Sequence, residues 1–383
     1  MRFVVSGGGT AGHIYPALAV SQELVARGHE VVFAGTPIGQ EARIVPEAGS
    51  PFQAFAARGF NRAKPLSLVT STLRLMASAR SARRWLLELC PHAVAGFGGY
   101  VSVPVGVAAR QAQAPLLVHE QNSAAGWANR FLAKRASVVA LTYGAARAGL
   151  RCPHTSRVVV TGNPVRRELL ALADPRQRDV ARATFRASMG IPADALVLLV
   201  FGGSQGARSI NNAVLDLAGQ LLAVAGLHVL HIAGPSQLAA VEERLSRELG
   251  DEQRPRWHAL GYCAQMGHAY VASDLAVARA GASSLAEIAA LGVASLVVPY
   301  PYATDDHQSA NARALVATGA AVCVSDADLS TAVFRDALVA CLRDESQRAR
   351  MAAAARALDA QGATDAVVSL LEGLASEARP QRP

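Results

Sequence analysis

Short apolar runs alternate with amphipathic stretches along the whole chain. Within the runs apolar residues follow one another without polar breaks, as in Phe3-Val4-Val5 and Leu196–Phe201. In the stretches between them, such as Pro16–Arg27 and Leu66–Leu89, apolar residues recur at the spacing of one helix face. An unbroken apolar run is typical of a strand buried on both faces, and its alternation with helices predicts parallel sheets covered on each side. The expected fold class is therefore α/β.

The expected strands fall into two sets, one in each half of the chain. The first set is Arg2–Ser6, Glu30–Ala34, Ala93–Gly96, Leu116–His119, Val138–Leu141 and Arg157–Thr161. The second set is Leu196–Phe201, Val229–Ile232, Trp257–Gly261, Leu275–Ala278, Ser295–Val298 and Ala321–Val324. A length of 383 residues suits two domains. Gly162-Asn163-Pro164 is the predicted hinge, which gives domains 1–163 and 164–383, and Asp174–Asp194 is predicted to be a polar connector carrying a short helix.

Composition narrows the class of protein without naming a ligand. Apolar residues make up 51% and charged residues 17%, which indicates a globular protein. The net charge of +8 fits nucleic acid, anionic lipid or a phosphorylated substrate, and does not choose among them. The five cysteines include no C-x-x-C pair, so neither a disulfide framework nor a thiolate metal site is expected. We expect neither an export signal nor a membrane span, since no apolar run approaches the length of about 20 residues that a span requires.

Two glycine-rich loops follow apolar strands and precede helices. They are Gly7–His13 and Gly202–Arg208, and they lie about half a chain apart. Such a loop offers backbone N–H groups and a helix N-terminus to an anion. The pair predicts two facing α/β domains that hold phosphate-bearing ligands between them. The alternative is that the glycines only make tight turns from strand to helix.

The first loop has the form G-x-G-x-x-G, which also occurs in dinucleotide-binding proteins. Those proteins place an acidic residue at the end of the next strand to bind a ribose hydroxyl. Here that strand ends in Gly35-Thr36, and Glu30 stands at its other end, which argues against a nicotinamide oxidoreductase. No glycine is followed by lysine, so a Walker A nucleotide loop is excluded.

Further polar residues follow the expected strands, where parallel sheets bind their ligands. His13 stands at the start of a helix, which disfavours a protonated imidazole and suits a general base or a hydrogen-bond donor; the alternative is a capping or packing histidine. Glu287 lies one turn into a helix that Gly281 precedes, where it suits two ribose hydroxyls; the alternative is a carboxylate that only favours the helix dipole. We expect no metal site, because Asp326-Ala327-Asp328 fits a turn and helix cap better.

Taken in order, these segments resemble one family of enzymes. They are Gly8–His13, Gly98–Tyr100, His119–Asn122, Gly162–Arg166, Gly202–Arg208, Gly281–Glu287 and Asp305–Asn311. They match the pattern of the MurG family, the bacterial UDP-N-acetylglucosamine:undecaprenyl-pyrophosphoryl-MurNAc-pentapeptide N-acetylglucosaminyltransferases, over essentially the whole chain. The resemblance implies a GT-B fold, in which two Rossmann-like domains with parallel sheets face a central cleft and the last helix often crosses back to the first domain. It also implies inverting, metal-independent transfer of GlcNAc from UDP-GlcNAc to the MurNAc 4-hydroxyl of lipid I, which forms lipid II for peptidoglycan, and no cofactor.

The resemblance also assigns roles to particular residues. On the donor side it implies Arg166, Ser204, Gln205 and Gly206 near the diphosphate, Cys263 near uracil, Ala282, Ser283, Ser284, Leu285 and Ala286 along the nucleotide, Glu287 on the ribose, and Gln308 on the sugar. From the first domain it implies that Thr10, Ala11, Gly12 and Asn122 reach the donor, with His13 as candidate base and Gly98, Gly99 and Tyr100 on the acceptor side. The chain departs from the family in having Ala11 where glycine is commoner, and in Ser283-Ser284-Leu285-Ala286.

A basic amphipathic segment in the first half suggests a membrane surface. Its basic residues are Arg58, Arg62, Lys64, Arg74, Arg80, Arg83 and Arg84, against the single acid Glu88. Such a segment lies at an anionic interface, or else it is a solvated helix that packs its apolar stripe on its own sheet. The lipid-linked acceptor of the family favours docking, and hence a peripheral enzyme on the cytoplasmic face of the bacterial inner membrane. Other cell-wall or division proteins are candidate partners, and nucleic acid is not an expected partner. Two alternative functions stay open: a lipid-dependent protein without catalysis, and a glycosyltransferase that acts on another lipid or a natural product.

Overall fold

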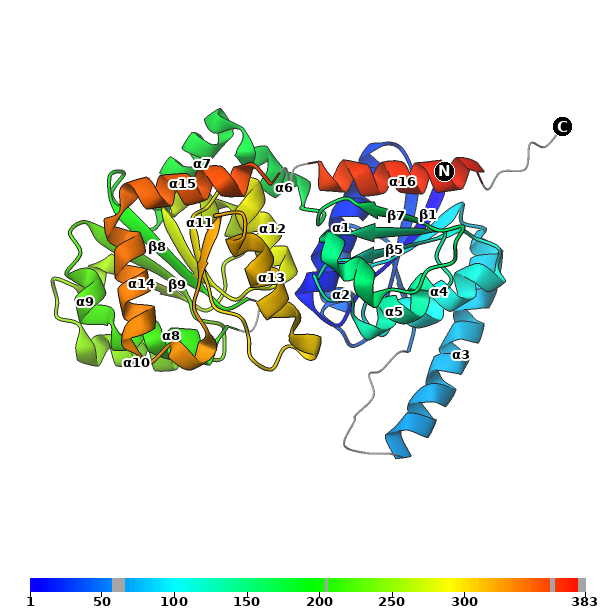
Figure 1. The fold of residues 1–383 in the computed structure, drawn as a ribbon, viewed down its shortest axis with the longest axis horizontal. Coiled ribbons are helices and arrows are strands. Elements are labelled where there is room, and N and C mark those ends of the chain that lie inside the picture. The colour runs from blue at the N-terminus through cyan, green and yellow to red at the C-terminus, as the bar shows by residue number, and fades with distance from the viewer. Residues whose placement is uncertain (57–65, 204–205, 359–361, 378–383) are drawn as a thin grey trace. The chain divides into compact units, whose positions relative to one another are not determined.

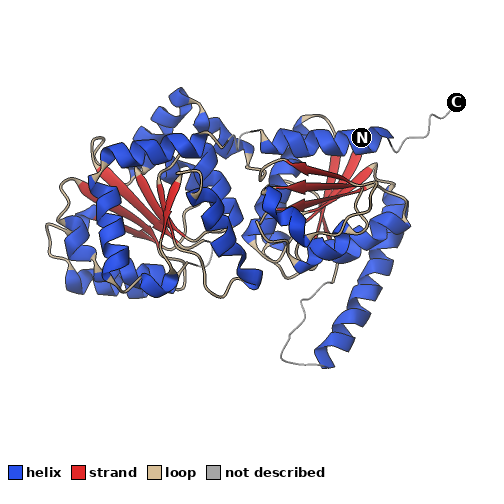
Figure 2. Ribbon diagram, viewed as in Figure 1, coloured by secondary structure: helices blue, strands red, loops and turns tan. Residues whose placement is uncertain are grey.

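The computed structural model describes residues 1–56, 66–203, 206–358 and 362–377, without the side chains of 66–74 and 304. Contacts divide the chain into two compact units, residues 1–167 with 361–383 and residues 168–360. Each unit is a parallel sheet with helices on both faces, as Figures 1 and 2 show. The fold class predicted from the sequence is confirmed. Residues 164–167 and the last helix, which follow the predicted boundary, belong by contact to the first unit.

The first unit is built on a seven-stranded sheet with the order β3-β2-β1-β4-β5-β6-β7. The strands are β1 (Arg2–Ser6), β2 (Glu30–Gly35), β3 (Phe52–Ala54), β4 (Ala93–Gly96), β5 (Leu116–Glu120), β6 (Val138–Leu141) and β7 (Arg157–Val160). All pairs are parallel, and the register places Ser6 beside both Ala34 and Gly96. The strand order reverses between β1 and β4, so the loops after these two strands flank the switch point where open sheets bind ligands.

The helices of the first unit form one layer on each face of this sheet. They are α1 (Ala11–Ala26), α2 (Glu41–Glu47), α3 (Leu66–Leu89), α4 (Ser102–Gln111), α5 (Trp127–Ala133) and α16 (Ala363–Glu377). Successive residues of β1 serve opposite faces, because side chains alternate along a strand. Phe3 and Val5 pack in a core with α1 and α16, and Val4 packs in a second core with α3, α4 and α5.

The last helix completes the first unit although it follows the whole second unit in sequence. Its apolar residues Val367, Val368 and Leu371 are fully buried in the core that contains β1 and α1. At its rim Glu372 accepts hydrogen bonds from Arg27 at 3.0 Å and His29 at 2.9 Å. The apolar stripe of α16 therefore replaces a covering helix that the first 160 or so residues do not supply.

The second unit is built on a six-stranded sheet with the order β10-β9-β8-β11-β12-β13. The strands are β8 (Leu196–Phe201), β9 (Leu227–Ile232), β10 (Trp257–Leu260), β11 (Leu275–Ala278), β12 (Ser295–Val297) and β13 (Ala321–Cys323). The helices are α6 (Arg167–Leu170), α7 (Pro175–Ser188), α8 (Arg208–Asp216), α9 (Ala218–Leu222), α10 (Leu238–Glu248), α11 (Met266–Ala272), α12 (Ala282–Leu291), α13 (His307–Val316), α14 (Ala332–Arg343) and α15 (Glu345–Arg356). The order again reverses, here between β8 and β11.

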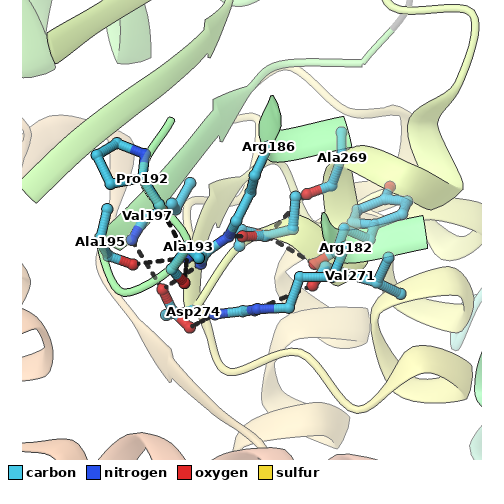
Figure 3. A network of polar contacts seen from close by, with 12 residues as sticks. Arg182, Arg186, Pro192, Ala193, Ala195, Val197, Ala269, Val271 and Asp274 are labelled. Carbon is cyan, nitrogen blue, oxygen red and sulfur yellow. Dashed lines mark hydrogen bonds and ion pairs between the residues drawn. The ribbon is translucent and has the colours of Figure 1, made fainter. Parts of the chain in front are cut away.

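The segment Asp174–Asp194 does carry the predicted helix, but it is a packed part of the second unit and not a polar connector. The segment contains α7, a helix of 14 residues whose Asp174 cap accepts from two backbone N–H groups. Arg186 is 2% exposed and donates to the carbonyls of Ala193, Ala195 and Ala272 and to Asp274 (Figure 3). A guanidinium has five N–H donors and can therefore bind several carbonyl groups at once. Arg186 uses them to hold together the segments that precede β8 and β11.

Strand bounds differ from the expected ones by one or two residues, and one strand was not predicted. The missed strand, β3, has only three residues and pairs with β2 at the edge of the sheet. β12 and β13 are equally short but lie in apolar runs, whereas Gln53 interrupts the apolar residues of β3, so β3 lacks the unbroken run that predicted the other strands. Within the described residues, no helix is both long enough and apolar enough to cross a membrane.

Candidate active site

The loops after β1, β4 and β5 meet at one edge of the first sheet. The amide of Phe97 donates to the carbonyl of Ser6 at 2.7 Å, and Gln121 Nε2 donates to the carbonyl of Phe97 at 2.8 Å. Ser102 Oγ lies 3.0 Å from the carbonyl of Ser6 and 2.6 Å from that of Gly98. These bonds bring the predicted segments Gly7–His13, Gly96–Ser102 and His119–Asn122 together.

His13 stands in the first turn of α1 with one ring nitrogen held by the first loop. Its Nδ1 lies 3.1 Å from the carbonyl oxygen of Gly8 and 3.1 Å from Thr10 Oγ1. A carbonyl oxygen only accepts, so its contact with Nδ1 favours the tautomer that has the proton on Nδ1 and, in the neutral imidazole, the lone pair on Nε2. This is the tautomer that a general base needs if Nε2 faces the substrate.

Gly98 and Gly99 lie against His13 and the first loop. A Cβ on Gly98 would stand 3.1 Å from His13 Nε2, and one on Gly99 would collide with the carbonyl of Gly8. Both residues also have φ in the left-handed region, at 93° and 77°. The two loops approach this closely only because both positions are glycine. Tyr100 follows them with its side chain 41% exposed, at the surface of this edge.

The first glycine loop is occupied by a carboxylate of the protein. Glu41, the first residue of α2, is fully buried, and its Oε2 accepts from the amide of Gly9 at 3.1 Å. Its Oε1 accepts from the amide and the hydroxyl of Thr36 at 3.0 and 2.5 Å. In the sequence Glu41 is an acid at the start of a helix, which is an ordinary pattern after a turn. Its contact with the first glycine loop was therefore not predicted.

A second buried carboxylate shapes the loop after β5. Glu120 is 1% exposed and accepts from the amide and side chain of Asn122, from the amide of Gly126 and from Asn129. His119 is stacked on Phe97, and its Nε2 lies 3.0 Å from the carbonyl of Gly162. Burial lowers the pKa of His119 to about 4, so it is neutral and donates to that carbonyl. Of this segment, Asn122 is the residue that is only half-buried.

Arg166 belongs to the first unit. Its guanidinium carbon stands 4.3 Å from the ring centre of Tyr15, on the helix that begins at Ala11. The family resemblance had placed Arg166 near the donor diphosphate, with the second domain. The remaining predicted residues of this unit, Thr10, Ala11 and Gly12, form the cap and first turn of α1 and are exposed or half-buried.

In the second unit, the glycine loop after β8 turns tightly into α8. Gly206 has φ of 74°, and a Cβ there would collide with the carbonyl of Ala233 at the end of β9. Its amide donates to the carbonyl of Gly203 at 3.0 Å. Ser204 and Gln205, both predicted to hold the diphosphate, lie outside the described residues.

The first turn of α12 follows β11 and presents small residues. Gly281, Ser283 and Ser284 are half-buried, whereas Ala282, Leu285 and Ala286 are buried. Leu285 packs in a core with Val297 and Ala312, so its side chain does not line a ligand site. The exposed part of this turn is therefore backbone and serine hydroxyl, which is the arrangement that binds phosphate or hydroxyl groups at a helix N-terminus.

Glu287 lies in the next turn of α12 and is 9% exposed. Its Oε2 accepts a hydrogen bond from the Tyr270 hydroxyl at 3.0 Å. This contact orients the Glu287 carboxylate within α12. Sequence patterns gave no sign of Tyr270, which is 17 residues away on α11.

Two further predicted residues are held by backbone groups near this edge. Gln308 Oε1 accepts from the amide of Tyr300 at 2.9 Å, which ties α13 to the turn after β12. Cys263 follows β10 and is 7% exposed, and burial raises the pKa of its thiol. A neutral, buried thiol does not act as a nucleophile, which agrees with a role for the Cys263 backbone only.

An ion pair that the sequence did not predict joins three loops of the second unit. Arg279, which directly follows β11, lies 2.6 Å from Asp326 and donates to Ser209 Oγ at 2.6 Å and to the carbonyl of Val298 at 3.2 Å. Ser209 is the second residue of α8. The cluster therefore fixes the helix that follows the glycine loop relative to the loops after β11 and β12. Among the described residues, no group of three His, Cys, Asp or Glu side chains is placed to hold a metal ion.

Comparison with known proteins agrees with this arrangement. The N-terminal domain of glycosyltransferase family 28 matches residues 3–141, and its C-terminal domain matches residues 197–369. A relative from Acidothermus cellulolyticus is 39% identical over 381 residues and covers 99% of both chains; one from Chlorobaculum parvum is 40% identical over 370 residues, with 95% and 96% covered. Both are named UDP-N-acetylglucosamine--N-acetylmuramyl-(pentapeptide) pyrophosphoryl-undecaprenol N-acetylglucosamine transferase.

Solved structures give the same result. The crystal structure of Acinetobacter baumannii MurG superposes with a TM-score of 0.73 at 31% identity, covering 97% of this chain and 99% of the other. The calicheamicin glycosyltransferase CalG4 superposes with a TM-score of 0.65 at 16% identity, which shows the shared GT-B fold alone. With both family 28 domains matched and near-full-length relatives above 30% identity, the chain belongs to the MurG family of glycosyltransferases.

Proposed function

We propose that this chain transfers GlcNAc from UDP-GlcNAc to the 4-hydroxyl of MurNAc in undecaprenyl-linked lipid I, forming lipid II for peptidoglycan synthesis. The observation that carries the proposal is the 39% identity over 381 residues to a relative named for this transfer. The enzyme acts in cell wall biogenesis, and hence in cell shape and division. Transfer proceeds with inversion at the anomeric carbon and without a metal or other cofactor.

The second unit binds the donor in this proposal. The glycine loop after β8, described at Gly202, Gly203 and Gly206, and the N-terminus of α12 receive the diphosphate, and Glu287 receives the ribose hydroxyls. Backbone N–H groups at the N-terminus of a helix are fixed before the reaction, so they stabilise the growing charge of a leaving diphosphate without reorganising. The half-exposed Ser283 and Ser284 support this assignment, because they leave the helix N-terminus accessible.

The first unit binds the acceptor and supplies the base. His13 takes the proton of the acceptor hydroxyl at Nε2 while the hydroxyl oxygen attacks the anomeric carbon. Support comes from the Nδ1 contact with the carbonyl of Gly8, which leaves the lone pair on Nε2. General base catalysis contributes about 10²–10⁴-fold, so His13→Ala should lower kcat by about 10²-fold or more and change the donor KM little.

Membrane docking of the first unit is the finer part of the proposal. In the described part of α3, Ala82 and Leu86 are buried in the unit's own core, while Arg80, Arg83 and Arg84 are exposed. Arg58, Arg62 and Lys64 lie outside the described residues, as does the side chain of Arg74. The helix thus packs one stripe inward and still offers three guanidinium groups to an anionic surface, which suits a peripheral enzyme on the cytoplasmic face of the inner membrane.

Direct assay of the purified chain tests the proposal. Radiolabelled GlcNAc should move from UDP-GlcNAc to lipid I, and the product should carry a β linkage if the donor is the α anomer. UDP-GalNAc serves as the control donor, and the aglycone of a natural product serves as the control acceptor. Transfer to the aglycone in preference to lipid I would instead identify a glycosyltransferase of another pathway, and donor binding without transfer would identify a non-catalytic protein.

A further inference from the structure

A single peptide group connects Glu41 to His13. The peptide bond between Gly8 and Gly9 is engaged at both ends: its N–H donates to Glu41 Oε2 at 3.1 Å, and its carbonyl accepts from His13 Nδ1 at 3.1 Å. Because a peptide is planar, its N–H and C=O are fixed relative to one another. In this orientation the peptide favours a proton on Nδ1 of His13, where the Thr10 hydroxyl, also 3.1 Å away, can accept or donate.

Glu41 is held so that it cannot serve a substrate directly. It is fully buried, and its other oxygen accepts both hydrogen bonds from Thr36. The Cα of Gly8 packs on the carboxylate, since a Cβ there would stand 2.5 Å from Oε1. A carboxylate with no solvent access and three backbone or hydroxyl donors is a fixed internal anion.

The peptide is enclosed on its carbonyl side as well. Gly99 lies so close to the carbonyl of Gly8 that a Cβ would collide with it. Rotating the peptide would break its bond to Glu41, whose carboxylate is buried, and would move its carbonyl away from His13 Nδ1. A buried carboxylate that loses a donor is unfavourable, so the observed orientation of the peptide is preferred.

We propose that Glu41 is the positioning residue for His13 and acts through the Gly8–Gly9 peptide; this rests on the proposed function of His13 as base. The negative carboxylate polarises the peptide and makes the Gly8 carbonyl a better acceptor, and linked hydrogen bonds strengthen one another. His13 keeps its proton at Nδ1 and receives the hydroxyl proton at Nε2. The resulting imidazolium keeps the Nδ1 bond to the carbonyl, so Glu41 also stabilises the charge that forms. The arrangement does the work of the acid in a Ser-His-Asp triad, with a peptide between acid and imidazole.

The first test needs no altered residue in the site. In protein labelled with ¹⁵N at histidine, two-bond ¹⁵N–¹H correlation spectra at neutral pH report the tautomer of each ring, and His13→Ala identifies the His13 signals by their loss. We expect His13 as the neutral Nδ1–H tautomer. An Nε2–H tautomer would overturn the proposal. This readout does not depend on catalysis, so a wild-type enzyme that fails to transfer GlcNAc would refute the proposed function and leave the tautomer result standing.

The second test removes the charge of Glu41. In Glu41→Gln the amide group must face a backbone N–H in either orientation, of Gly9 or of Thr36. We expect kcat to fall by about 10- to 100-fold, as for outer partners of ligating histidines, with an unchanged donor KM and a mixture of His13 tautomers. Glu47→Gln, on the exposed end of the same helix α2, is the matched control and should behave as wild type.

A double variant separates positioning from a general role in folding. If Glu41 acts through His13, adding Glu41→Gln to His13→Ala should lower kcat no further, because the group that it positions is already gone. Multiplicative losses would show that Glu41 acts independently of His13 and would overturn the proposal. An unchanged kcat and tautomer in Glu41→Gln would do the same.

Discussion

Replacement of Glu287 tests the donor site of the second unit most directly. Glu287 is 9% exposed in α12, and one of its oxygens accepts from Tyr270, which is 1% exposed. Glu287→Ala therefore removes two things at once: the acceptor for the ribose hydroxyls and the partner of a buried phenol. The two losses act on different quantities, donor affinity and folding stability, and can be measured apart.

The magnitudes follow from the hydrogen bonds that are lost. A hydrogen bond to a charged group contributes about 1.5–3 kcal/mol, which corresponds to about a 10- to 150-fold loss of donor affinity. Loss of the hydrogen bond from the buried Tyr270 hydroxyl to Glu287 costs the folded state about 1.5–3 kcal/mol, because its acceptor is charged. Tyr270→Phe removes only the hydrogen bond between residues 270 and 287, because the carboxylate of Glu287 stays in place. It should change stability and alter the donor KM by much less than tenfold.

The assay compares wild type, Glu287→Ala, Glu287→Gln and Tyr270→Phe. UDP binding by titration calorimetry and the UDP-GlcNAc KM measure the donor site, and urea unfolding measures stability. Glu287→Gln should fall between wild type and Glu287→Ala in affinity, since it keeps an acceptor oxygen and loses the charge. Unchanged KM and kcat for UDP-GlcNAc in Glu287→Ala would refute the assignment of Glu287 to the ribose.

Four further predictions concern other parts of the molecule. Activity should persist in excess EDTA, and a loss that Mg²⁺ or Mn²⁺ restores would indicate a metal-dependent transferase. Replacing Arg80, Arg83 and Arg84 with Glu should release the protein from anionic vesicles, at about 1 kcal/mol per residue, and spare activity on a short-chain soluble acceptor; vesicle binding equal to that of wild type would contradict the docking. Arg186→Met should lower the free energy of unfolding by about 1–3 kcal/mol, because the carbonyls of Ala193, Ala195 and Ala272 lose their donor while Asp274 keeps Arg182, whereas a loss below about 1 kcal/mol in urea unfolding would contradict the network. Burial lowers the pKa of His119 and His231 to about 4 from an ordinary 6.5, so the unfolded chain binds more protons than the folded chain between these two values. Their contribution to the free energy of unfolding should be flat above pH 6.5 and fall by about 1.4 kcal/mol per pH unit and histidine as the pH drops toward 4. Equal urea midpoints at pH 7 and pH 5 would contradict this prediction.

Local sequence determined the elements and the edge of each sheet where ligands bind. The apolar runs of β1 and β8 are buried on both faces, as an unbroken run predicts, and the polar segments that follow β1, β4 and β5 do meet. These features depend on residues that are neighbours in sequence, on side-chain alternation and on the parallel arrangement of strands, so pattern alone predicts them. The family was also evident from sequence, because seven separate motifs occur in one order.

Only the tertiary structure decided which distant groups pair with these motifs. Glu41 reaches Gly9 across 32 positions, and Arg27 meets Glu372 across 345. No periodicity records such pairs, since each partner looks locally like an ordinary helix-start acid or a surface charge. The packing of Arg186 was not predicted for the same reason: it donates to the carbonyls of Ala193, Ala195 and Ala272 and to the carboxylate of Asp274, which come together only after the sheet has formed. The sequence alone therefore identifies the loops where ligands can bind, whereas tertiary packing decides which charged side chains are buried beside those loops.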